Sequence, residues 1–226
     1  MTSQNDLPSV SAIVAEIDAR LRALPGPKTE DTRAVRRVIS KRLAKAPPQA
    51  VIELALRLLK HLGIEHRFVA YELVSHHRAA LRSLRARQLK QLGRGINSWG
   101  AVDTFACYLA GPVWRELQAP DQLIHRWARS KDRWWRRAAL VSTVPLNSKA
   151  RGGRGDAART LQVCRMLAPD RDDMVVKALS WALRELAKRD PMAVRKFLAE
   201  EEEVLAARVL REVRNKLMTG LKNPHR

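Results

Sequence analysis

An indole and a carboxylate one helical turn apart form the first pair of residues that could do chemistry in this chain. Trp99 and Asp103 follow Asn97 and Ser98, either of which can cap a helix that starts there. The two side chains then share one flank of that helix. An indole face beside an ionised carboxylate stabilises positive charge. The alternative is an aspartate favoured by the helix dipole, next to a tryptophan that only packs.

A second group combines indoles with arginines in the run RWWRRAA, which starts at Arg133. Arg133 and Arg137 align one turn apart and could reach one phosphate or two successive ones. We therefore expect loss of Arg137 to weaken binding to all nucleic-acid sequences alike. The slope of log affinity against log salt concentration should flatten by about one. Trp134 and Trp135 are interpreted as core residues that seat the helix.

A third group lies at spacing i, i+4 and i+7, where Trp181 has Lys177 one turn before it and Arg184 about one turn after it. Two cationic neighbours are unusual for a tryptophan of the core. This pattern favours a surface that meets a polyanion.

The glycine-rich segment 147–157 carries Arg151 and Arg154. Its glycines predict a mobile loop. The loop is either a cationic clamp on a nucleic-acid backbone or a solvated segment with no ligand.

The charge of the whole chain indicates the class of partner. Its 226 residues have a formal net charge of +20, which suits a polyanion, and nucleic acid is favoured over a membrane. No apolar run approaches the roughly 20 residues that span a bilayer, and the start MTSQNDLPSV has neither a basic leader nor an apolar export segment. We therefore expect a cytoplasmic protein.

Metal and redox sites are not expected. Cys107 and Cys164 are predicted to be reduced core thiols, and two cysteines exclude a four-cysteine cluster. His61 and His66 are five residues apart, which misses the i, i+4 spacing of two ligands on one helix, and no third ligand accompanies them in the sequence. The prediction is no metal and no cofactor.

These residues must be positioned by helices, because apolar residues recur with a period of 3.6 and no segment alternates like a strand. We predict about twelve helices of roughly ten to sixteen residues. The breaks between them are expected at 25–28, 46–48, 93–95, 111–112 and 147–156.

A faint repeat suggests how the helices are arranged. Ala70, Ala106, Ala138 and Ala178 begin similar four-residue patterns at separations of about 36, 32 and 40 residues, which suits stacked helix pairs of the HEAT type. The expected fold is an all-α, right-handed α-solenoid with a concave basic face. It forms one domain over 1–226, with N-terminal helices in 8–45 and a disordered tail at 220–226.

Three segments carry a resemblance to a known family: WGAVD at 99–103, WARSKDRWWRRAA at 127–139 and KALSWALRELAKRDPMAVRKFL at 177–198. Together they resemble the DNA alkylation repair family of AlkD-like HEAT-repeat DNA glycosylases. The resemblance covers most of residues 50–217 and is looser before residue 90.

The resemblance implies excision of cationic N3- and N7-alkylpurines from duplex DNA without base flipping. It implies that Asp103 orients the attacking water, that Trp99 and Trp181 contact the sugar, and that Arg137 contacts phosphate. An alkylated purine is already a good leaving group, so the site has only to stabilise an oxocarbenium-like sugar. One departure is that Asp173 and Met174 stand where the family commonly has aromatic residues.

Two other functions use the same surface. A non-catalytic HEAT protein that binds branched or damaged DNA needs the basic face but not Asp103. A protein-binding scaffold predicts no steep salt dependence of DNA binding. The expected partner is duplex DNA that contains alkylated purines, bound by a monomer with no membrane contact, at the nucleoid.

Overall fold

The computed structural model describes residues 9–26, 28–61 and 63–224, and it is helical throughout, with no strand in those ranges. The all-α fold predicted from the 3.6-residue period is confirmed. The contacts divide the chain into two compact units, Met1–Arg94 and Gly95–Arg226. The boundary falls at the glycine pair of 93–95, which the sequence analysis identified only as a break between helices.

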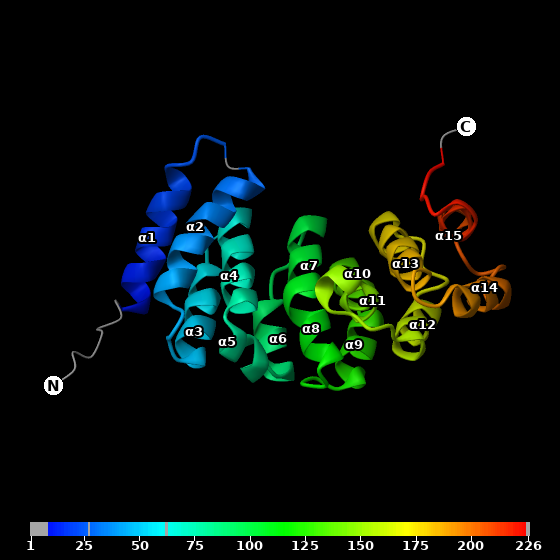
Figure 1. Cartoon of the computed structure of the whole chain (residues 1–226), viewed down its shortest axis with the longest axis horizontal. Helices are drawn as coiled ribbons and strands as arrows, with labels where there is room; N and C mark the ends of the chain where they lie inside the picture. The colour runs from blue at the N-terminus through cyan, green and yellow to red at the C-terminus, as the bar shows by residue number, and fades with distance from the viewer. Residues whose placement is uncertain (1–8, 27, 62, 225–226) are drawn as a thin grey trace. The chain divides into compact units, whose positions relative to one another are not determined.

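The first unit is built around α4. Its helices are α1 (Val10–Arg22), α2 (Thr29–Arg42), α3 (Pro48–Leu58), α4 (Ile64–His76), α5 (Arg78–Ser83) and α6 (Ala86–Leu92) (Figure 1). Helix α4 packs against α1, α2, α3 and α5. One apolar stripe of α3 is buried, since Leu54, Ala55 and Leu58 have almost no exposed surface. Burial of that stripe is what holds α3 against its neighbours.

The second unit is a row of packed helices. It contains α7 (Trp99–Phe105), a π-helical turn η1 (Ala106–Ala110), α8 (Gly111–Arg115), α9 (Asp121–Ala128), α10 (Arg133–Ser142), α11 (Val144–Asn147), a 3-10 turn η2 (Lys149–Arg151), α12 (Ala157–Met166), α13 (Asp173–Leu186), α14 (Pro191–Glu200) and α15 (Ala207–Thr219) (Figure 1). Helix α10 packs against α7 and α13, and α13 packs against α15. This order of contacts is that of stacked helix pairs. The right-handed superhelix, its concave basic face and the single domain stay predictions.

The break predicted at 111–112 is wrong, because the chain passes from α7 to α8 without leaving the helix. The N–H of Gly111 donates to the carbonyl of Ala106, five residues back, which is the π-helical pattern. Pro112 then occupies the first turn of α8, where its missing N–H costs little. Gly111 is required for packing, since a Cβ there would lie 2.7 Å from the Ser142 carbonyl oxygen.

The segment 147–157 is bonded to the rest of its unit at several points, and its mobility stays a prediction. Arg189 donates through Nε to the Asn147 carbonyl and through Nη2 to the Gly153 carbonyl, each at 2.7 Å. Gly155 donates to the Leu146 carbonyl at 3.0 Å. Gly152 and Gly155 have φ angles of +78° and +100°. These two glycines therefore adopt a left-handed backbone that other residues rarely take.

Three further expectations concern the tail, the cysteines and membranes. In the described part of the tail, the Asn215 side chain donates to the Lys222 carbonyl at 3.2 Å, and the disorder of 220–226 stays a prediction. Residues 225–226 lie outside the described residues, as does residue 8 of the N-terminal segment. Cys107 and Cys164 are free and buried, as predicted. In the parts of the chain that the structure describes, no helix combines the length and apolarity needed to cross a bilayer.

Candidate functional site

Asp103 is held by a two-bond ion pair with an arginine from another helix. Helix α7 begins where expected, with the Ser98 hydroxyl accepting from the N–H of Ala101 at 3.3 Å. Arg137 of α10 donates to the two carboxylate oxygens of Asp103, through Nε at 2.9 Å and through Nη2 at 2.8 Å. This planar fork fixes both the position and the orientation of the carboxylate. The Asp103 side chain keeps 19% of its surface exposed, so solvent still reaches it.

Arg137 joins three helices, and its contact with phosphate stays a prediction. Its third donor, Nη1, bonds the carbonyl of Met174 on α13 at 2.6 Å, and the residue is only 6% exposed. The i, i+4 spacing predicts that Arg137 lies beside Arg133 on an open flank of α10. The packing of α10 against α7 and α13 instead encloses the Arg137 guanidinium. In this structure Arg137 fixes the orientation of Asp103 through two hydrogen bonds.

The environment shifts the ionisation of Asp103 in two opposed ways. Burial raises the pKa of this carboxyl above its ordinary value of 3.8, and it is the larger effect. The hydrogen bonds and the charge of Arg137 lower the pKa and so oppose the rise. The carboxylate thus sits where its charge is less screened by water and acts more strongly on a nearby cation.

The two tryptophans expected beside Asp103 come from helices on either side of α10. Trp99 lies one turn before Asp103 and is 62% exposed, an unusual exposure for an indole. Trp181 is half-buried on α13, two turns after Met174 and on the same face of that helix. Because α10 packs against both α7 and α13, Arg137 is the link between the helices that carry both indoles.

The paired tryptophans of RWWRRAA have different surroundings, and both are half-buried rather than fully in the core. Trp135 packs on Trp127, with ring centroids 4.9 Å apart, and meets Phe105 edge-on at 6.1 Å. Trp134 instead lies under the guanidinium of Arg133, whose Cζ is 5.2 Å from the ring centroid. Trp135 therefore seats α10 as predicted, whereas Trp134 supports an exposed cation.

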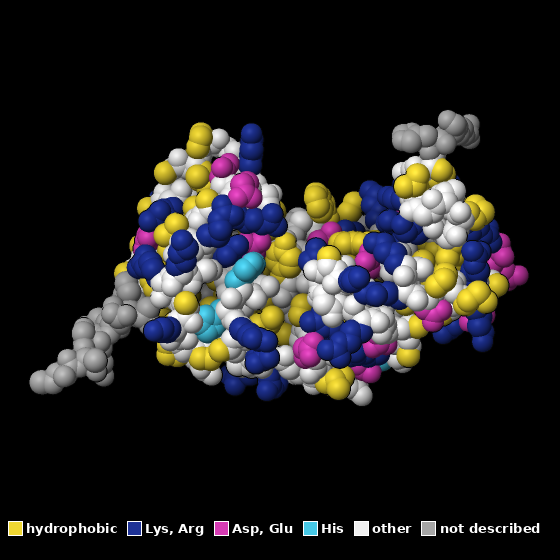
Figure 2. Space-filling model, in the orientation of Figure 1, with side chains coloured by type: hydrophobic (Ala, Val, Ile, Leu, Met, Phe, Trp, Pro, Cys, Tyr) yellow, Lys and Arg dark blue, Asp and Glu magenta, His cyan; other side chains and the backbone are white. Residues whose placement is uncertain are grey.

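The exposed cations of α10 and α13 are paired with acids that precede or begin α13. Arg133 reaches Asp172 at 3.4 Å, and Lys177 reaches Asp173 at 2.7 Å. Asp173 also binds Arg208, and the hydrogen bond from Lys177 is the main cause of its lowered pKa. In the view of Figure 2 basic and acidic side chains of this unit lie side by side. Asp173 thus pairs with Lys177, one of the cations expected to meet phosphate.

Three other predicted cations have distinct settings. Arg184 donates to the Ser180 hydroxyl at 3.2 Å, and burial lowers its pKa. The Arg151 guanidinium lies over the Tyr108 ring, 5.4 Å from the centroid. Arg154 is exposed. Of the three, Arg154 has the position most open to a phosphate.

Sequence reasoning missed the acids that organise this surface. Asp170 binds Arg136 at 2.7 Å, and Asp172 caps α13 by accepting from the N–H of Met174 at 2.9 Å. The signal was present in the letters DRDD at 170–173, directly before an apolar run, which is the composition of a helix start.

No residue of this site belongs to a group of metal ligands among the residues described. One such group does occur elsewhere, in the first unit, where Asp18 joins His61 and His66. The statement that no third ligand accompanies these histidines is therefore wrong, because the folding of α1 supplies one from a distant part of the sequence.

Comparison with known proteins identifies both a family and a fold. Residues 22–217 match the family described as DNA alkylation repair enzyme. A solved structure described as a predicted DNA alkylation repair enzyme from Enterococcus faecalis is similar, with a TM-score of 0.67 and 16% sequence identity over 96% of this chain and 98% of that chain. No curated protein matches the sequence. At that identity the structural likeness shows a shared fold.

Proposed function

Because this chain belongs to the DNA alkylation repair enzyme family, we propose that it is a monofunctional DNA glycosylase that excises cationic N3- and N7-alkylpurines from duplex DNA. The observation that carries the proposal is the Asp103 carboxylate, fixed by two hydrogen bonds from Arg137 and one turn from an exposed indole. An ion pair that only holds helices together does not require an exposed tryptophan next to it. The exposed indole of Trp99 therefore favours a ligand-binding role for this carboxylate.

The chemistry begins with cleavage of the bond between C1′ of the sugar and the ring nitrogen of the purine. The bonding electron pair leaves with the base and neutralises its positive charge, so no general acid is required. The positive charge passes to the sugar, where the Asp103 carboxylate and the faces of Trp99 and Trp181 stabilise it. A water oriented by Asp103 then forms the new C1′–O bond and gives up its proton to that carboxylate or to solvent.

The same set of residues supports catalysis without base flipping. Its candidate members are a carboxylate and two indoles, groups that suit a cationic sugar and not the hydrogen-bonding edge of a base. Enzymes that extrude a base usually read it in a pocket. A site directed at the sugar tolerates large substituents on the purine.

Release of free 7-methylguanine from methylated duplex DNA tests this function. Base release should be lost in Asp103→Asn and Trp181→Ala, while both variants still bind the duplex. Asp170→Asn is a matched control, because Asp170 forms a similar ion pair with Arg136 of α10. Wild-type protein that releases no base yet binds branched DNA tightly would instead establish the non-catalytic DNA-binding alternative.

The proposed substrate also indicates the partner and the place of action. Exposed Arg133, Lys177 and Arg154 suit the phosphates of a duplex, which a monomer would bind without a cofactor. Repair of the chromosome implies a cytoplasmic protein that is found at the nucleoid when bound to DNA.

A further inference from the structure

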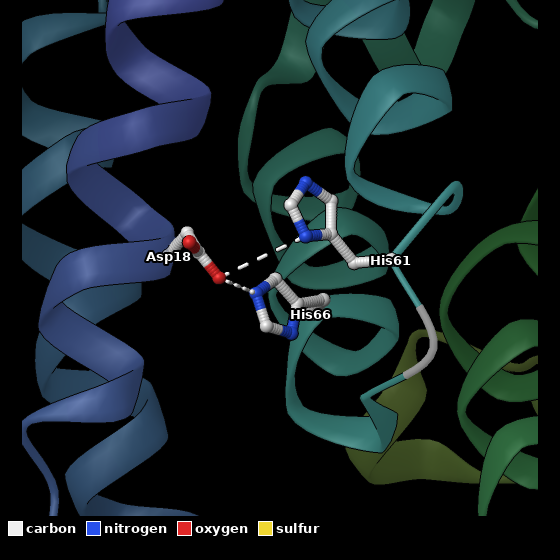
Figure 3. A group of neighbouring side chains, drawn as sticks. All are labelled: Asp18, His61 and His66. Atoms are coloured by element: carbon white, nitrogen blue, oxygen red, sulfur yellow. Dashed lines mark hydrogen bonds and ion pairs between the residues drawn. The ribbon is translucent and has the colours of Figure 1, made fainter.

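Three potential metal ligands meet in the first unit, far along the chain from Asp103. Figure 3 shows Asp18 of α1, His61 in the connection after α3, and His66 in the first turn of α4. Oδ1 of Asp18 lies 3.1 Å from Nε2 of His66 and 3.7 Å from Nδ1 of His61. All three ligand atoms lie within 4.8 Å of one another.

We propose that Asp18, His61 and His66 form a binding site for a divalent transition-metal ion, with Zn²⁺ the best fit. Two imidazole nitrogens and one carboxylate oxygen are a ligand set that Zn²⁺ accepts, with a fourth position left for water. Ligands about 2.0–2.1 Å from a tetrahedral ion lie roughly 3.4 Å from each other. The two distances from Asp18 fall on either side of that value.

The hydrogen bonds of the fold leave His66 incompletely satisfied. Its Nε2 lies 3.1 Å from Oδ1 of Asp18, while its Nδ1 is buried and has no hydrogen-bond partner. Unsatisfied buried polar atoms are costly. This incomplete set of partners singles out His66 as a candidate ligand.

The unpartnered nitrogen and a carboxylate oxygen border the same space, although no hydrogen bond joins them. A Cβ placed on Gly63 would be 2.6 Å from Nδ1 of His66 and 3.3 Å from Oε2 of Glu65, so both atoms lie next to the space that the missing side chain of Gly63 leaves. A carboxylate behind a ligating histidine is the usual second shell of a zinc site.

The nearby charges and the exposure of the site also permit an ion. Arg22 pairs with Oδ2 of Asp18 at 2.9 Å and leaves Oδ1 to the histidines. The histidine rings stack with 4.6 Å between centroids and 4° between planes. To aim both lone pairs at one ion, His61 has to turn, which its 32% exposed side chain allows. His61 also lines an open groove of about 700 Å³ between α1 and α3, through which water reaches the fourth position.

The consequence is a cross-link between α1 and the start of α4. Asp18 and His66 are 48 residues apart, so an ion that holds both stabilises the folded first unit against separation of α1. The site has no part in base excision, and its failure would leave the proposed glycosylase activity untouched.

The test is a titration of untagged, chelator-treated full-length protein with Zn²⁺. Calorimetry measures binding, and thermal melting measures the gain in stability. Co²⁺ serves as a second probe, because its visible absorption reports its ligands. The variants are Asp18→Asn and His61→Ala. His76→Ala is the control, because His76 is an exposed histidine of the same unit outside the cluster. Circular dichroism checks that each variant folds.

We expect one equivalent of Zn²⁺ to bind wild type and His76→Ala and to raise their melting temperature. Loss of a direct ligand should weaken binding by more than the roughly 10- to 100-fold typical of second-shell changes. Failure of wild type to bind, or equal binding by His61→Ala, would overturn the site.

Discussion

Each unit of the molecule contains a buried acid bound by arginine between helices, and the two acids differ in how completely they are enclosed. In the first unit Glu72 of α4 is 2% exposed, and each of its oxygens accepts from a different arginine of α2, Arg33 and Arg36, at 3.0 Å. In the second unit a single arginine, Arg137, binds both oxygens of Asp103, and 19% of that side chain stays exposed.

The difference separates an acid used for structure from one available for chemistry. Both carboxylate oxygens of Glu72 accept hydrogen bonds from arginines of α2, and the side chain has no exposed surface where a ligand could bind. Asp103 is oriented by the fork of Arg137 and remains open beside Trp99. Preorganised charge in a partly water-excluded position is what a developing cation needs. The variants below test whether the two acids can be told apart in this way.

The largest effect is expected from Arg137→Met. It leaves Asp103 partly buried without its partner, so we expect base release to fall by about 100- to 1,000-fold and stability by roughly 3 kcal/mol. Single-turnover release of 7-methylguanine and urea unfolding measure the two. Arg136→Met is the control, since Arg136 binds Asp170 and not Asp103. Equal losses of base release in both variants would contradict the orienting role.

Glu72→Gln should produce the opposite pattern. Loss of the charge weakens the hydrogen bonds from Arg33 and Arg36, so we expect unfolding free energy to fall by about 1–3 kcal/mol. Base release per folded molecule should stay at the wild-type value. Urea unfolding and an assay well below the melting temperature check these. A drop in base release without a drop in stability would make Glu72 part of the site.

The pH dependence of base release should identify Asp103. Its reactive form is the carboxylate, and burial raises the pKa of this group above 3.8. Activity should therefore fall with decreasing pH at a higher pH than an ordinary aspartate would give. Arg137→Gln removes a charge that lowers the pKa and should move this acidic limb further upward, whereas Asp170→Asn should not. If the fall in activity at low pH occurs at the same pH in Arg137→Gln as in wild type, Asp103 is not the group that controls it.

The smallest effect is expected from Arg133→Ala. Its side chain is 54% exposed and its ion pair with Asp172 is long at 3.4 Å, so it can exchange that partner for a phosphate. The slope of log affinity against log salt should flatten by about one. Arg165→Ala is the control, since Arg165 is similarly exposed and bound to acids on another helix. The same flattening in both variants would remove Arg133 from the interface.

The sequence predicted what depends on neighbours within one helix. The start of α7 at Ser98 follows from local capping chemistry. The contact of Asp103 with Arg137 joins residues 34 apart, and spacing along one helix carries no information about it. The spacing instead placed Arg137 beside Arg133 on an open flank, which the packing of α10 between two helices overrides.

Glycines and histidines show the same limit. The glycines of 147–157 predict mobility, and composition alone does not reveal that Gly152 and Gly155 meet a geometric requirement, a positive φ. Spacing along the sequence does not link Asp18 to the two histidines, because only the packing of α1 against α4 brings that carboxylate to them.

The π-helical turn between Asp103 and Pro112 makes this segment tolerant of a change in length that a regular helix would not accept. A π-helical turn accommodates one residue more than regular α-helix. Deletion of a single residue in 106–110 would let the helix become regular, with its hydrogen bonds intact. Five residues of a π-helical turn cover about the same rotation as four of an α-helix, so Trp99 and Asp103 would still face Arg137. A one-residue gap in the regular helix α8 would instead rotate the preceding turns by about 100° around the axis and carry both side chains away from Arg137.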